Sequence, residues 1–135
     1  MAKAKTWIEK RDCGKAPHVK TIDKAFTGMP AGCKMLISSP QEIEEFIKRI
    51  PKGEFVEPAK MRQALAKKHK ADATCPVTTG LFLRIVAEAA FEEFSQGKAV
   101  NKLTPFWRVI ANDSALAKKL STDTGQLEYF KKLTG

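Results

Sequence analysis

Cys75 is the strongest candidate for a reactive side chain in this sequence, although a thiol can either act as a nucleophile or lie inert in a core. It precedes a run with helical periodicity, so the positive end of a helix dipole and the lysines shortly upstream would favour its thiolate. His18 and His69 are the candidate bases, and the sequence shows no positioned acid beside either of them. The favoured interpretation of Cys75 is therefore a buried structural residue, and a thiol nucleophile is the alternative.

Cys13, His18 and Cys33 raise the question of a zinc site, because cysteine and histidine are the usual zinc ligands. Their spacing contains neither a Cys-x-x-Cys nor a His-x-x-x-His pair that would bring four ligands together. We therefore expect no metal and no other cofactor. The chain of 135 residues has three cysteines, an odd number, and they lie far apart, so we do not expect a disulfide framework.

Basic side chains dominate the charge of the chain, with 24 lysines and arginines against 15 acidic residues and a net charge of +9. This balance points to nucleic acid or another anionic partner. It is strongest in an expected helix from Pro58 to Lys70, which contains no acidic residue. The candidate nucleic-acid contacts on this helix are its cations Lys60, Lys67, Lys68 and Lys70.

A second helix should follow Cys75, with Thr78 or Thr79 as its N-cap. Phe82, Ile85, Val86 and Ala89 share one face of it, which is typical of a core contact. On the other face a single long cation lies among small residues, and such a face can approach another surface closely. The candidate contact residues there are Thr78, Thr79, Gly80, Arg84 and Ala87. A plain core helix with one solvated arginine is the alternative interpretation.

The remaining elements fit a single small domain. Residues 1–39 combine eight basic residues with repeated glycine and proline, which favours an irregular basic arm along a phosphate backbone. Residues 34–38 and 54–57 are expected as short strands, and a helix should start at Ser39 and Pro40. Two short helices should close the chain, at 114–120 and 126–133. No apolar run is long enough to cross a membrane, so we expect a cytoplasmic protein.

Phe106, Trp107 and Arg108 form an aromatic and cationic group near the second helix. An exposed aromatic ring can hold a nucleic-acid base by stacking, and Arg108 would add a contact to DNA. A core role for the two rings is an equally good interpretation, because large aromatic side chains dominate cores.

The order of these motifs resembles the C-terminal DNA-binding domain of the alkylguanine-DNA alkyltransferases and the alkyltransferase-like proteins. The resemblance covers residues 40–135 and rests on Ile50–Val56, on Leu83–Val86 and on Thr104–Ile110. It implies a winged-helix or helix-turn-helix-like α/β domain, mostly helical with short strands, which binds the minor groove of duplex DNA. Arg84 falls at the position of the arginine finger of that family.

The departures from the family concern its chemistry. Phe106 stands where the acceptor cysteine is expected, and Trp107 replaces the adjacent histidine; Pro58 and Thr134 stand at two further positions of the reaction centre. Neither Phe106 nor Trp107 can supply the thiolate and base that alkyl transfer needs.

The resemblance therefore implies a DNA-binding protein that is not an enzyme and that recognises alkylated or distorted duplexes through a base pocket at Phe106 and Trp107. Two alternatives stay open. One is a thiol-dependent alkyl acceptor that uses Cys75, and the other is a protein-interaction module that has lost DNA binding.

Overall fold

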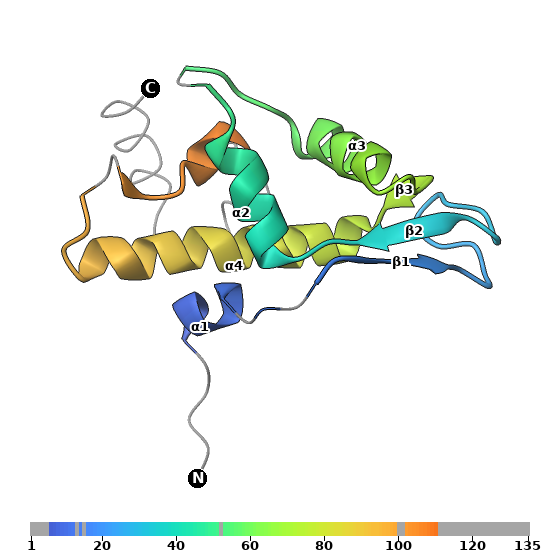
Figure 1. Cartoon of the computed structure of the whole chain (residues 1–135), viewed down its shortest axis with the longest axis horizontal. Coiled ribbons are helices and arrows are strands. Elements are labelled where there is room, and N and C mark those ends of the chain that lie inside the picture. Colours follow the sequence, from blue (N-terminus) through green and yellow to red (C-terminus); the bar gives the residue numbers. More distant parts are fainter. Residues whose placement is uncertain (1–5, 13, 15, 52, 100–101, 111–135) are drawn as a thin grey trace, which may run out of the picture.

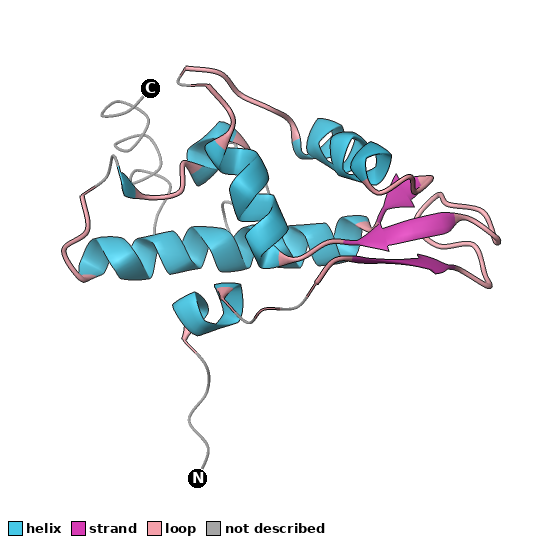
Figure 2. Cartoon of the chain, viewed as in Figure 1, coloured by secondary structure: helices cyan, strands magenta, loops and turns pink. Residues whose placement is uncertain are grey.

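The structure is a computed structural model, and it describes residues 6–12, 14, 16–51, 53–99 and 102–110. Within these residues the chain combines helices with a three-stranded sheet (Figure 2), which confirms the prediction of a mixed α/β protein. The elements in chain order are α1 (Trp7–Arg11), β1 (His18–Thr21), β2 (Lys34–Ile37), α2 (Pro40–Lys48), α3 (Pro58–Lys68), β3 (Ala73–Thr74), α4 (Pro76–Ser95) and the 3-10 turn η2 (Phe106–Arg108).

The sheet has the order β1-β2-β3. β1 is antiparallel to β2, with His18 opposite Ile37, and β3 is parallel to β2. The predicted strand at 34–38 is confirmed as β2, but the strand predicted at 54–57 is wrong. The chain there is a loop, whose Val56 amide donates to the carbonyl oxygen of Arg108 at 2.8 Å. The residues just before Val109 form the 3-10 turn η2, Phe106–Arg108.

α4 is the central element, and other helices lie along both of its sides (Figure 1). α1 packs on one side of it, while α2 crosses it on the other. The sequence suggested one buried face, yet Ala87 and Phe91 on the opposite face are also buried. The middle of α4, residues 85–91, is therefore buried on every side, and its small alanines let the neighbouring elements approach closely.

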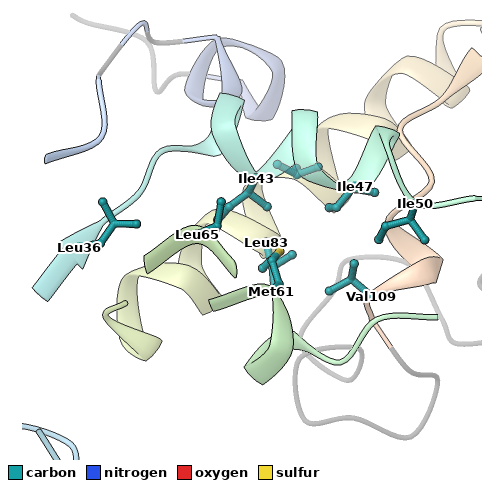
Figure 3. Close-up of a cluster of buried hydrophobic side chains, with 9 residues drawn as sticks. Leu36, Ile43, Ile47, Ile50, Met61, Leu65, Leu83 and Val109 are labelled. Carbon is teal, nitrogen blue, oxygen red and sulfur yellow. The ribbon is translucent and has the colours of Figure 1, made fainter. Parts of the chain in front are cut away.

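The main core cluster joins β2, α2, α3, α4 and the segment after η2 (Figure 3). Ile43 and Ile47 form a buried apolar stripe on α2, and Ile50 just past its end extends the stripe. Ser39 caps this helix by accepting from the Glu42 amide at 3.1 Å, and Pro40 occupies its first turn. On α3 the inward residues are Met61, Leu65 and Ala66, whereas Ala64 is exposed.

The N-terminal segment is more ordered than an irregular arm, and this corrects the expectation for its described part. Thr6 and Glu9 form a reciprocal capping box around α1, and the Glu92 carboxylate on α4 accepts from the Trp7 amide at 2.9 Å. Arg11 is buried against Glu93 of α4 and Glu44 of α2. These anchors are far away in sequence, so local composition does not reveal them. The helices expected at 114–120 and 126–133 lie outside the described residues.

Candidate nucleic-acid interface

The outward surface of α3 carries a row of cations. Met61 and Leu65 point into the core at helical spacing, so the side chains on the other side of the helix face solvent. Lys60, Lys67 and Lys70 are exposed, in agreement with the sequence prediction that they are available to a partner. We call this surface the α3 basic surface; it comprises Lys60, Arg62, Lys67, Lys68 and Lys70.

A hollow of about 580 Å³ lies between α3, the turn around Met29 and the start of α4 at Pro76. Arg62 and Lys67 line it from α3, and Asp72 is the acidic residue in its lining. The Thr74 hydroxyl donates to the carbonyl oxygen of Arg62 at 2.7 Å, which ties α3 to β3. An anion the size of a phosphate therefore meets more positive than negative charge in this hollow.

Lys70 sits in a left-handed backbone conformation just past the end of α3, with φ of 55°. The Lys70 amide donates to the carbonyl oxygen of Lys67 at 3.2 Å, and the Ala71 amide donates to that of Ala66 at 2.8 Å. This pair of bonds closes the helix in a Schellman-type cap. A lysine at a position that favours glycine lowers the free energy of unfolding, so the fold alone does not explain a cation here.

Glu42 restrains the C-terminal end of α3. Its carboxylate accepts from the Ser38 hydroxyl at 2.6 Å and lies 2.6 Å from His69 Nε2 and 3.4 Å from Lys68 Nζ. Burial raises the pKa of Glu42, but the hydrogen bonds from Ser38 and His69 outweigh burial and leave the pKa below its usual value. Lys68 is therefore partly neutralised, and Lys60, Lys67 and Lys70 are the freer cations of the α3 basic surface.

The start of α4 differs from the sequence prediction. Cys75 is the N-cap and Pro76 opens the helix, so Thr78 and Thr79 lie within the first turn and do not cap it. The Thr79 hydroxyl donates back to the carbonyl oxygen of Cys75 at 2.7 Å and is 1% exposed, which removes Thr79 as a contact residue. Thr78 and Gly80 are half-buried.

Cys75 is 3% exposed and belongs to a small apolar cluster with Ile22, Met29, Cys33 and Met35. A thiol enclosed by apolar side chains is not open to an external electrophile. Its surroundings favour the structural interpretation over the nucleophile. Cys13 lies outside the described residues.

Arg84 is covered by α1. Its guanidinium carbon lies 5.3 Å from the centre of the Trp7 ring, within the range of a cation–π contact. The Arg84 Nε atom is buried and has no hydrogen-bond acceptor among the described residues. Trp7 and Arg84 are far apart in the sequence, so helical periodicity does not reveal their contact. Trp7 beside the capping box of Thr6 and Glu9 is the sequence signal that could have predicted a helix packed on the domain.

Phe106 and Trp107 lie in the core, at 0% and 2% exposure. Phe106 makes edge-to-face ring contacts with Phe91 and with Trp107, at centroid distances of 5.0 and 5.1 Å. The expectation of a base pocket at these two rings is therefore wrong for this conformation, because they fill space against α4. Ala87, which was also a candidate DNA contact, is fully buried in the same cluster.

Arg108 is directed to the protein itself, since its Nη1 donates to the carbonyl oxygen of Ile50 at 2.7 Å. In the described part of the chain, no group of three or more histidine, cysteine or acidic residues is arranged to hold a metal ion. None of the described helices is both long enough and apolar enough to span a bilayer.

Comparisons with known proteins were made at the level of family models, curated proteins and solved structures, and none of the three finds a match to this chain.

Proposed function

We propose that this protein binds duplex DNA without acting on it chemically, and that it does so through the α3 basic surface. The observation that carries the proposal is the exposure of Lys60 and Lys67 on a helix that contains no acidic residue, and of Lys70 just past its end. Lysine ammonium groups are point charges suited to phosphate oxygens, and phosphate contacts supply most of the sequence-independent affinity for DNA.

The finer proposal for the fold is a winged-helix-like arrangement of the alkyltransferase-like type. In it, α3 and α4 are the helix pair, joined through β3, and the hairpin of β1 and β2 is the wing. The hollow beside Arg62 and Lys67 supports this arrangement, because it opens where α3 meets the first turn of α4. A phosphate group of the duplex backbone would lie there.

Binding in this proposal does not depend on a lesion. Phe106 and Trp107 are buried and so present no face to an extruded base, and Arg84 is engaged with Trp7. The protein should therefore bind a plain duplex and a duplex with an alkylated guanine equally well. Its intact mass should stay unchanged after incubation with the alkylated duplex, since Cys75 is enclosed.

The test is a fluorescence-anisotropy titration of labelled duplexes with the wild type and single alanine variants at several salt concentrations. Lys67→Ala and Lys60→Ala should weaken binding and lower the slope of log affinity against log salt by about 0.9 for each phosphate that the variant no longer neutralises. Lys102→Ala is the matched control, because it removes one exposed lysine that lies beyond the C-terminal end of α4. An equal effect of Lys67→Ala and Lys102→Ala would contradict the assignment to α3.

A further inference from the structure

β1 forms one edge of the described sheet, and all four of its residues are exposed. An edge strand presents unpaired backbone N–H and C=O groups to which another extended chain can add. Beside it, the first turns of α4 expose two large apolar side chains, Val77 at 60% and Leu81 at 53%. Single exposed apolar residues are ordinary, but a free strand edge next to two of them is a common feature of peptide-binding surfaces.

Two hollows of about 540 and 520 Å³ lie along this junction. One is lined by His18 and Leu81 and the other by Lys20 and Val77, and we refer to the two hollows together as the β1–α4 groove. Most of its apolar lining comes from α4 and β2 and includes Met35, Ile37, Val77, Leu81, Phe82 and Ile85, while Ile22, Phe26 and Cys75 add to it. Charged and titratable groups also line it, namely Lys10, His18, Lys20 and Lys24 against Asp23. The groove is therefore apolar at its base and mostly basic at its rim.

The β1–α4 groove and the α3 basic surface lie on opposite faces of the sheet. Neighbouring residues of a strand point to opposite faces, and on β2 Leu36 packs with the residues of α3 while Met35 packs with Cys75 at the start of α4. His18 and Lys20 are opposite Ile37 and Met35, so they share the face on which the first turns of α4 line the two hollows. A partner in the groove would leave the DNA surface free.

We propose that the β1–α4 groove binds an extended segment of a partner protein in which acidic and apolar residues alternate. Its backbone would pair with the free edge of β1. Its apolar side chains would cover Val77 and Leu81, and its carboxylates would lie near Lys20 and Lys24 at the rim.

DNA and a second copy of the chain fit this groove less well than an acidic peptide. Val77 and Leu81 offer no hydrogen-bond donors to a phosphate backbone, and other apolar groups shield them from water best. A second copy would bring together two chains that each carry a net charge of +9. Acidic side chains in the partner complement the basic rim instead.

The test uses a labelled synthetic peptide of about ten residues that alternates leucine and glutamate, with a lysine-for-glutamate peptide and a short duplex as the other probes. Fluorescence anisotropy measures binding, and amide chemical-shift changes map the site. The variants are Leu81→Asp in the groove and Lys67→Ala on α3. Both residues are exposed, and circular dichroism checks that each variant is folded.

The wild type should bind the acidic peptide saturably, with shifts confined to β1 and the first turns of α4. Leu81→Asp should weaken this binding by about tenfold or more and leave the DNA affinity unchanged, while Lys67→Ala should do the opposite. The proposal would be overturned if the wild type bound the lysine peptide as tightly as the acidic one. It would also be overturned if Leu81→Asp bound the acidic peptide as tightly as the wild type does. A loss of DNA binding in Leu81→Asp, which would assign the groove to DNA, would overturn it too, as would a wild-type dimer that Leu81→Asp dissociates.

Discussion

Replacing Arg11 with methionine tests whether α1 is an integral part of the domain. The methionine keeps part of the apolar stem but removes a cation that contacts Glu93 and lies 3.4 Å from Glu44 and 3.0 Å from Asp12. Burial lowers the pKa of Arg11, but its acidic partners outweigh burial and raise the pKa above its ordinary value, so the group stays charged. The substitution therefore removes the buried counter-ion of two poorly solvated carboxylates and leaves each of them only a more exposed lysine, Lys48 for Glu44 and Lys98 for Glu93.

The expected loss follows from the exposure of these groups. Breaking a buried ion pair by removing one partner costs about 3 to 5 kcal/mol. The side chain of Arg11 is 11% exposed and those of Glu44 and Glu93 are each 15% exposed, so the lower end, about 3 kcal/mol, applies. For a domain of this size that loss corresponds to a fall in melting temperature of about 12 °C.

Urea unfolding followed by circular dichroism measures the free energy, and hydrogen exchange of the α1 amides reports its docking. Asp12→Asn is the control, because the Asp12 side chain is 50% exposed and its pairing should be worth less than about 1 kcal/mol. A stability of Arg11→Met within about 0.5 kcal/mol of the wild type would refute the claim that α1 is anchored by a buried cation.

Three further predictions concern the core, pH and the end of α3. Trp107→Ala should cost about 3 to 5 kcal/mol in urea unfolding, because the ring is 2% exposed; a loss below about 1 kcal/mol would place the ring outside the core. Glu42→Gln should lose about 1 to 2 kcal/mol at neutral pH. The pKa of Glu42 is lower in the folded protein than its unfolded value of 4.5, so the carboxylate contributes its full stabilisation above that pH and loses it as the pH falls through the folded pKa. The unfolding curves of Glu42→Gln and the wild type should therefore converge in acid and not in alkali. Lys70→Gly should raise the free energy of unfolding by about 0.5 to 1 kcal/mol, because φ is positive there, and should weaken DNA binding in the anisotropy assay. A variant in which stability and DNA affinity both rise, or both fall, would contradict this reasoning.

The sequence predicted the elements whose signals are local. Ser39 and Pro40 mark the start of α2, and the isoleucines at helical spacing identify its buried face. The absence of acidic residues along α3 likewise predicted an exposed basic helix, and Lys60 and Lys67 are exposed there. Each of these predictions depends on residues within a few turns of one another.

The errors have a common physical cause, which is contact between residues far apart in the chain. Periodicity left one face of α4 for a partner, but α1 covers Arg84 there through Trp7. Phe106 and Trp107 read equally well as a stacking surface or as a core, and only their packing against α4 decides between the two. Pro76 opens α4 before the threonines that the sequence offered as caps, because proline fits the first turn of a helix.

The most direct test of DNA binding through α3 is the salt dependence of duplex affinity for the wild type and for a variant with alanine at Lys60, Lys67 and Lys70. These three lysines are exposed, so their removal should leave the fold intact. The account predicts a steep fall in wild-type affinity between about 50 and 200 mM salt, and a slope that is smaller in the variant by about 0.9 for each of the three phosphates that its alanines leave without a cation. A wild-type affinity that does not change with salt, or a variant with an unchanged slope, would contradict it.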